Sequence, residues 1–284
     1  MLLILKAIII GIVEGITEFL PVSSTGHMII AGSLIGFDGT VYRKAYTDMF
    51  SVVIQLGAIL AVVVLYWDKI MSTLKNFLPS DRVPVKKCGL KFWINIGIAS
   101  IPAAAIGMPF NDKIEEKLFY PLPVTIALIV GAIWMIYAEN RYRNNSKTTS
   151  IDDINAKQAI IIGLFQCLAL WPGMSRSAST IIGAWIVGLS TVAAAEFSFF
   201  LAIPAMIGAS GMSLIKHNVF STCSSIELIA LAAGFIVSFI VALVVIDKFI
   251  AFLKKKPMKV FAIYRIALGI VLMVLIYSNI IKWH

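Results

Sequence analysis

Charged side chains are scarce in this chain. Only 14% of its 284 residues are Asp, Glu, Lys or Arg, whereas 60% are hydrophobic. A soluble domain usually carries about 25% charged residues, and the mean hydropathy of this chain is +0.92. The scarcity of charge therefore excludes an ordinary water-soluble domain and indicates a protein of the lipid bilayer.

Cysteine is also rare, with three residues at Cys88, Cys167 and Cys223. They are scattered and show no metal-ligand spacing, which argues against a disulfide framework or a structural zinc site. We expect free thiols.

The net charge of +9 is distributed unevenly. Residues 69–91, 141–157 and 248–259 hold 15 of the 24 Lys and Arg residues. This alternation along the chain is the positive-inside pattern of membrane proteins, so the three basic loops are expected on the cytoplasmic side. The charge pattern favours a membrane and not a nucleic acid as the partner.

Six apolar segments have the length of a membrane span: about 47–67, 92–110, 121–138, 193–215, 226–249 and 260–281. They predict an all-α polytopic membrane protein in which residues 1–284 form a single integral membrane domain. With the basic loops inside, both termini lie outside.

Two further apolar stretches, about 3–36 and 159–189, do not fit simple spans. Each is interrupted by a polar sequence, Pro21-Val-Ser-Ser-Thr-Gly-His27 in one and Pro172-Gly-Met-Ser-Arg-Ser-Ala-Ser-Thr180 in the other. We call these segments the first and the second break. Pro and Gly end helices, and the freed backbone groups must be buried in protein or face a cavity. Each stretch is therefore predicted to be a re-entrant helical hairpin.

The two stretches resemble each other. Ala7-Ile-Ile-Ile-Gly11 is identical to Ala159-Ile-Ile-Ile-Gly163, and Ser23 and Ser175 correspond at the same offset. The match predicts two repeats, about 1–142 and 155–284, each a hairpin followed by three spans. Because three is odd, the second repeat is expected to be inverted relative to the first. Paired broken helices in two such repeats indicate a binding site where their tips meet.

Glu14 and Glu18 lie four residues apart in the helix before the first break, so both carboxylates share one face. A charged residue in a bilayer core costs roughly 2.5–3.5 kcal/mol on insertion scales and usually has a function. Two adjacent carboxylates repel and are relieved by a shared proton or a bound cation. Oxygen ligands favour a divalent cation, Mg²⁺ or Ca²⁺. The alternative is that both groups are solvated at the membrane surface.

Hydroxyl groups follow the carboxylates at Ser23, Ser24 and Thr25. They precede a second short helix, whose N-terminus offers backbone N–H groups to an anion. Simple N-capping would use the same residue types.

The second break supplies a cation, Arg176, between Ser175 and Ser177, with Thr180 four residues later. A guanidinium with hydroxyl groups at a helix start suits a phosphate. The alternative is that Arg176 pairs with Glu14 or Glu18 and joins the two halves, and both roles are compatible.

His27 is a candidate for proton transfer, with capping or packing as the alternative. Three other charged residues, Arg265, Asp48 and Glu196, lie near span ends, where their side chains are expected to reach the membrane surface.

Together these residues predict a metal-assisted site for a phosphate or diphosphate carried on a lipid. A hydroxyl beside a carboxylate base can act as a nucleophile and form a phospho-enzyme. Arg176 and a divalent ion would stabilise the charge of the transferred group. The residues alone do not identify which lipid carries the phosphate or diphosphate.

The two broken segments resemble the signature motifs of the bacterial undecaprenyl-diphosphate phosphatases, also called bacitracin-resistance proteins. Both motifs are complete, and the likeness runs the length of the chain. The resemblance implies hydrolysis of undecaprenyl diphosphate to the monophosphate and inorganic phosphate, which recycles the lipid carrier of peptidoglycan synthesis. It also implies a bacterial plasma membrane location with the site facing outside, and a contribution to bacitracin resistance.

The resemblance also implies residue roles by motif position. Glu14 and Glu18 would bind the metal, and Glu18 would also act as the base. Ser24 becomes the leading nucleophile candidate, and His27 and Arg176 support catalysis. The diphosphate is expected to contact Ser23, Thr25, Ser175, Ser177 and Thr180.

Several alternatives stay open at this point. Metal-bound water could attack directly, with the serines only binding. A polyprenyl-phosphate transporter or flippase would also use inverted repeats with broken helices. The oligomeric state is open, with a homodimer as one option.

Overall fold

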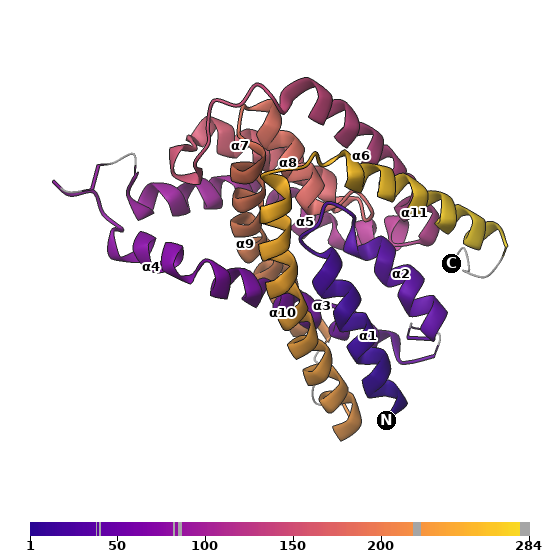
Figure 1. The fold of residues 1–284 in the computed structure, drawn as a ribbon. Coiled ribbons are helices and arrows are strands. Elements are labelled where there is room, and N and C mark those ends of the chain that lie inside the picture. The colour runs from indigo at the N-terminus through magenta and orange to yellow at the C-terminus, as the bar shows by residue number, and fades with distance from the viewer. Residues whose placement is uncertain (38, 40, 82, 85–86, 218–222, 279–284) are drawn as a thin grey trace.

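The computed structural model describes residues 1–37, 39, 41–81, 83–84, 87–217 and 223–278. Within these residues the chain is almost entirely helical (Figure 1). Six helices of the described chain are long and apolar enough to cross a membrane. They are α3 (Lys44–Leu65), α5 (Gly89–Leu118), α6 (Pro121–Tyr142), α9 (Thr191–His217), α10 (Ser225–Leu253) and α11 (Lys259–Tyr277). The all-α class and the six spans are confirmed.

The first broken stretch forms helices α1 (Leu2–Thr17) and α2 (Ser24–Ile35), separated by the first break. Figure 1 shows α1 running from the N-terminus to the middle of the molecule and α2 running back from there. Gly36 ends α2 with a φ of 62°, a left-handed conformation that glycine adopts readily.

The second broken stretch forms α7 (Ala156–Gln166), a short 3₁₀ helix η3 (Cys167–Leu170) and α8 (Arg176–Ile186). A further 3₁₀ turn, η2 (Ile151–Asp153), precedes α7. Asn155 and Gln158 form a capping box at the start of α7. Both stretches are therefore helix–break–helix units.

Two features differ from the predicted spans. Helix α5 continues to Leu118, beyond the expected end at residue 110, although it contains Pro102 and Pro109. A separate helix, α4 (Trp67–Lys75), lies in the basic loop 69–91. The indole Nε1 of Trp93 donates to Thr73 Oγ1 at 3.0 Å and so ties α4 to α5. Short amphipathic helices of this kind have no apolar run of span length, so span length alone did not predict α4.

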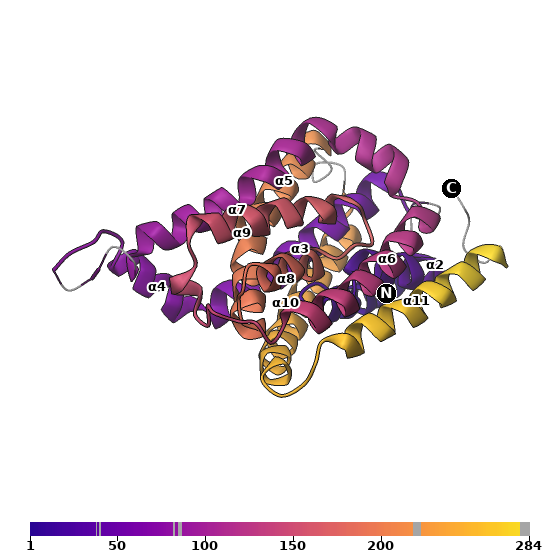
Figure 2. The ribbon, with the colours of Figure 1, turned by 90° about the horizontal axis from the view of Figure 1, so that it is seen from above.

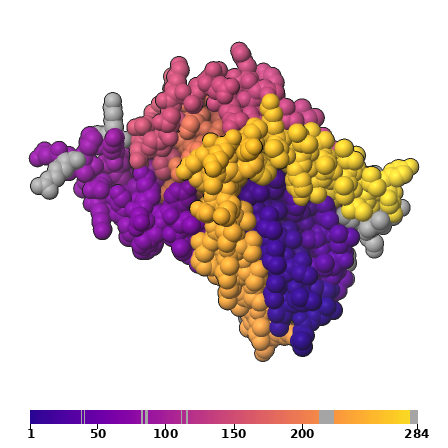
Figure 3. All heavy atoms as spheres, in the orientation of Figure 1, coloured from indigo at the N-terminus to yellow at the C-terminus, as the bar shows by residue number. Residues whose placement is uncertain are grey.

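The hairpins pack against spans through small residues. A Cβ added at Gly11 of α1 would lie 2.6 Å from the backbone oxygen of Gly234 in α10. At the matching position of α7, a Cβ on Gly163 would lie 2.5 Å from the backbone oxygen of Ala99 in α5. Such close approaches are typical of helix packing in membranes. Figure 3 shows α1 lying alongside α10, and Figure 2 shows α11 lying beside α6.

The two breaks have the same backbone conformation. Ser23 and Ser175, the residues before α2 and α8, have φ angles of 69° and 70°, and no other non-glycine residue of the described chain has a positive φ. At the far ends, Phe37 N–H donates to Gly32 O at 2.7 Å and Leu189 N–H donates to Ala184 O at 2.9 Å. These pairs stand at the same offset as the sequence match. The inverted orientation of the two halves stays a prediction.

Candidate functional site

The two breaks lie against each other and are joined by an ion pair. Arg176 Nη2 donates to Glu18 Oε1 at 3.2 Å, although 158 positions separate the two residues. Their side chains are 12% and 4% exposed, so little water screens the pair. Beside it, Ser177 Oγ donates to Leu20 O at 3.0 Å. The break of each half thus holds the other in place.

Glu18 also contacts a hydroxyl group. Ser24 Oγ donates to Glu18 Oε2 at 2.8 Å, while Arg176 occupies Oε1. A distance of about 2.6–3.2 Å is the range expected between a nucleophile and its base. The carboxylate is thereby fixed between a cation and a candidate nucleophile.

Glu14 lies one turn earlier on α1 and is completely buried. Neither of its carboxylate oxygens has a hydrogen-bond partner among the described residues. The surface alternative for Glu14 is wrong, because this side chain is shielded from solvent by protein. The desolvation of such a carboxylate is offset by a shared proton, a cation or a ligand.

A divalent cation fits these oxygens. Mg²⁺ is commonly held by one or two carboxylates together with the phosphates of a substrate, and Glu14 and Glu18 offer that number. In the described part of the chain, no group of three or more His, Cys, Asp and Glu side chains is placed to hold a metal ion. The other ligands would have to come from the substrate or from water.

One nitrogen of the Arg176 guanidinium has no hydrogen-bond partner among the described residues. Its Nη1 donates to Ser198 O at 2.9 Å, which anchors the guanidinium on α9. Its Nε is buried and has no partner within the described chain. A bound metal phosphate would satisfy both groups, since the metal would bind the Glu14 carboxylate and a phosphate oxygen would accept from Arg176 Nε.

The other polar groups of the second break are engaged within the protein. Ser175 Oγ accepts from Ala178 N–H at 3.3 Å and so caps α8, and it lies 3.1 Å from Ser177 Oγ. Thr180 Oγ1 donates to Ser198 Oγ at 2.8 Å. Ser177 and Thr180 are fully buried, so their hydroxyl groups hold α8 against the first break and α9.

The first break differs in its capping. Ser23 precedes α2 but makes no side-chain capping hydrogen bond, so the simple capping alternative is wrong for this residue. Ser24 and Thr25 begin the helix and are partly exposed. The first-turn N–H groups of α2 therefore lack the serine cap that α8 has, and they remain suited to an anion.

His27 is held by two partners. Its Nδ1 lies 2.8 Å from Ser23 O, which can only accept, so this nitrogen carries the proton. Its Nε2 lies 2.7 Å from Tyr264 Oη on α11, and the two rings are stacked with centroids 5.5 Å apart. His27 thus fixes the backbone at Ser23 and does not bond directly to Glu18 or Arg176 in the structure.

Arg265 follows Tyr264 on α11 and is fully buried. Its Nη2 donates to Gly173 O at 3.1 Å and to Met174 O at 3.0 Å, both in the second break. Its Nε and Nη1 are buried without partners among the described residues. The expectation that Arg265 reaches the membrane surface is therefore wrong. Consecutive residues of α11 support both breaks, Tyr264 through His27 and Arg265 directly.

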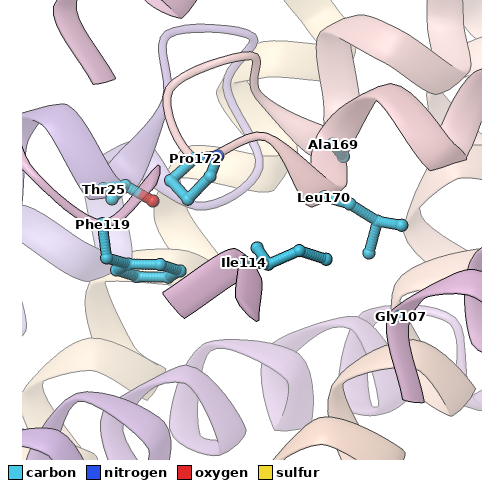
Figure 4. Close-up of a pocket in the computed structure, with 7 residues that line it drawn as sticks. All are labelled: Thr25, Gly107, Ile114, Phe119, Ala169, Leu170 and Pro172. Carbon is cyan, nitrogen blue, oxygen red and sulfur yellow. The ribbon is translucent and has the colours of Figure 1, made fainter. Parts of the chain in front are cut away.

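A cavity of about 190 Å³ opens beside the two breaks (Figure 4). Thr25 borders it from the first break and Pro172 from the second. The remaining lining residues are apolar or glycine: Gly107, Ile114, Phe119, Ala169 and Leu170. The cavity therefore lies beside residues of both breaks.

Comparison with known proteins identifies the family of this chain. A family model described as bacitracin resistance protein BacA matches residues 7–271. The chain belongs to the BacA family.

Its relatives in this family match it over nearly their whole length. It is 64% identical to an undecaprenyl-diphosphatase of Clostridium novyi (strain NT), with 98% of each chain covered. It is 57% identical to an undecaprenyl-diphosphatase of Clostridium tetani (strain Massachusetts / E88), with 99% of each chain covered. The resemblance inferred from the two broken segments is confirmed at the level of the family.

The sequence analysis of this BacA family member missed Ser198 and Tyr264, and it placed Arg265 wrongly at the membrane surface. Arg265 carried a usable signal, because an arginine six positions into an apolar span has no short path to water. Ser198 and Tyr264 carried none, since a serine and a tyrosine are ordinary in membrane helices.

Proposed function

We propose that this BacA family member is a membrane phosphatase that hydrolyses undecaprenyl diphosphate to undecaprenyl phosphate and inorganic phosphate. The reaction recycles the lipid carrier for peptidoglycan and envelope glycan synthesis and contributes to bacitracin resistance. The relative of Clostridium novyi named for this diphosphatase activity is 64% identical. The observation that supports the chemistry is the buried contact of Glu18 with both Ser24 and Arg176.

The diphosphate would bind between the two breaks. Arg176 Nε is free to donate to a phosphate oxygen, and the uncapped start of α2 offers N–H groups near Ser23 and Thr25. Ser175 borders the same region on the α8 side. Ser177 and Thr180 are buried and engaged with protein groups, so we assign them to placing Arg176 rather than to direct contact.

Bond formation would begin at Ser24. Glu18 accepts the Ser24 proton along the 2.8 Å hydrogen bond, and Oγ attacks the terminal phosphorus. The bond from that phosphorus to the bridging oxygen breaks, and undecaprenyl phosphate leaves. Water then attacks the phosphoserine, the phosphorus–Oγ bond breaks, and the proton returns to Ser24. Arg176 offsets the charge of the transferred group throughout.

Glu14 and Glu18 would hold the divalent cation, Mg²⁺ or Ca²⁺. When bound, the cation neutralises charge on the diphosphate and favours displacement at phosphorus. The buried Glu14 carboxylate, which has no donor among the described residues, is the main support for this assignment. His27 would act by holding Ser23 and the start of α2 in position.

The substrate is a lipid of the bacterial plasma membrane, and we propose that the site opens to the outer side. The support is the positive-inside pattern, which places the basic loops 69–91, 141–157 and 248–259 in the cytoplasm. A homodimer and the absence of nucleic-acid binding stay predictions.

Phosphate release from undecaprenyl diphosphate by the purified protein tests the proposal. We expect release that requires Mg²⁺ or Ca²⁺, stops with a chelator, and is lost in Glu18→Gln. Intact-mass analysis after acid quenching should detect a phosphate on Ser24. If Ser24→Ala retains turnover, water attacks directly and the serine only binds.

A folded wild-type protein that releases no phosphate with either metal would contradict the hydrolase. In that case, proteoliposomes that move intact lipid monophosphate across the bilayer would support a flippase. The hydrolase and the flippase differ in one measured product, because only the hydrolase releases inorganic phosphate.

A further inference from the structure

A second cavity lies in the first basic loop, where α4 ends. Its volume is about 410 Å³, within the range of roughly 300–1,000 Å³ that is usual for ligand pockets. Val83 is partly buried and the other described lining residues are exposed, so the cavity is an open groove. We call it the α4 groove, and it is lined by Lys75, Asn76, Phe77, Leu78, Pro79, Ser80 and Val83.

Backbone hydrogen bonds hold the α4 groove in shape. Gly89 N–H donates to Asn76 O at 2.9 Å, and Leu90 N–H donates to Phe77 O at 2.9 Å. The chain that leaves α4 is thereby fastened to the start of α5. Two more backbone hydrogen bonds, at 3.0 and 2.9 Å, close the turn of residues 80–83. The groove is therefore a built feature of the loop.

Contacts between the three basic loops place the groove on one charged face. Lys69 Nζ donates to Asp152 Oδ2 at 2.6 Å and joins the first basic loop to the second. Arg143 Nη2 donates to Lys256 O at 3.0 Å and joins the second to the third. Loops that follow and precede membrane spans lie at the headgroup level of the bilayer. The α4 groove is thus expected at the membrane surface, on the side of the basic loops.

Large apolar side chains are exposed in and beside the groove. Phe77 and Leu78 line it and are 38% and 64% exposed, and on α4 Trp67 and Leu74 are 52% and 50% exposed. Figures 1 and 2 show α4 projecting from the side of the other helices. Apolar side chains of a basic amphipathic helix at a membrane surface are expected to enter the boundary between headgroups and acyl chains.

The same loop is positively charged. Residues 69–91 include six Lys and Arg residues and one acidic residue, Asp81. The ion pairs of the described chain use Lys69 and do not include Lys75. The Lys75 ammonium, at the rim of the groove, therefore has no carboxylate partner within the described residues and can bind an anion. Basic residues next to a span attract anionic lipids.

We propose that the α4 groove binds an anionic phospholipid of the membrane, with its phosphate at Lys75 and the start of its acyl chains along Phe77 and Leu78. Asn76 and Ser80 supply further donors for the headgroup. A free phosphate ion would use the polar wall and leave the apolar wall in water, whereas a phospholipid matches both. The site is separate from the two breaks and does not depend on the proposed phosphatase activity.

Photo-crosslinking in vesicles tests this site. The full-length protein is reconstituted in phosphatidylcholine that contains a small, non-saturating fraction of phosphatidylglycerol with a diazirine in its acyl chain. We expect labelled peptides that cover residues 75–83. Lys75→Gln should lower this labelling about fivefold, the effect of one lysine near a charged membrane surface. Leu78→Asn should lower it about tenfold, because lipid would no longer bury the leucine.

Lys157→Gln is the matched control, since Lys157 is an exposed lysine of the second basic loop. It should leave the labelling of residues 75–83 unchanged. Lys75 and Leu78 are both exposed, so all three variants should melt like the wild type in detergent, which checks that they fold.

Four results would overturn the proposal. The label could map outside residues 75–83, or fall as far in Lys157→Gln as in Lys75→Gln, which would mean a general effect of surface charge. A phosphatidylcholine probe could label the groove equally, which would exclude selection for an anionic headgroup. Inorganic phosphate in excess could displace the label, which would assign the groove to a free anion.

Discussion

At the scale of single residues, the site consists of buried charges whose partners come from distant parts of the sequence. Glu18 is held by Ser24 of its own break and by Arg176 of the other. Arg176 in turn is anchored on Ser198 of α9. A guanidinium can serve a carboxylate, a carbonyl and a phosphate at once because its donors form a rigid fork, which a lysine ammonium cannot reproduce.

Arg176→Lys should therefore lower kcat for phosphate release by about 10²–10³-fold, the range seen when one charge-stabilising donor is removed. Arg143→Lys is the control. It makes the same change at an arginine that pairs with Glu139, away from the breaks. Phosphate release measured at saturating substrate compares the two. Similar activity of both variants would mean that Arg176 does not contact the transferred group.

Glu14→Gln tests the metal assignment at the same scale. The amide keeps the shape of the side chain but removes the negative charge, so the protein should need at least about tenfold more Mg²⁺ for half-maximal activity, the range found when groups around a metal are removed. The measurement is a Mg²⁺ titration of phosphate release. An unchanged Mg²⁺ requirement with reduced kcat would assign Glu14 to another role.

At the scale of elements, small residues allow the hairpin helices to approach the spans closely. Gly11 packs on the backbone of α10 and Gly163 on the backbone of α5. These contacts fix the height of each break, because α1 and α7 lead directly into them. Helix α11 then supports both breaks through Tyr264 and Arg265.

Gly163→Leu should destabilise the protein, since a Cβ would lie 2.5 Å from the backbone oxygen of Ala99, which cannot move as a side chain can. Overpacking costs about 1–3 kcal/mol, which corresponds to a fall in Tm of roughly 2–12 °C. Thermal melting in detergent measures it. Gly208→Leu, with nothing within 4 Å of its Cβ, should melt like the wild type; an equal fall in both would refute the close-packing argument.

At the scale of the whole molecule, the distribution of charge determines how the chain lies in the membrane. Lys255 lies in a basic loop that is expected in the cytoplasm, and Lys44 lies in a loop that is expected outside. Both residues are exposed. In a chain without its three natural cysteines, Lys44→Cys should react with a membrane-impermeant thiol reagent in intact cells. Lys255→Cys should react only after the membrane is opened, and the reverse pattern would invert the proposed orientation.

The sequence by itself determined the class of the protein, its six spans and the two breaks. Hydropathy over span lengths and helix-ending Pro and Gly are local signals, so they can be read without a structure. The same holds for most candidate residues of the site, because Glu14, Glu18 and Arg176 stand out as charges in apolar surroundings.

Only the tertiary structure decided which groups are paired and which are left over. It joined Glu18 to Arg176, engaged Thr180 with Ser198, and placed His27 on Tyr264. It also moved Arg265 from an expected surface position to a buried one beside the second break. These contacts link residues far apart in the chain, and their partners depend on how helices pack in three dimensions, which no local pattern encodes.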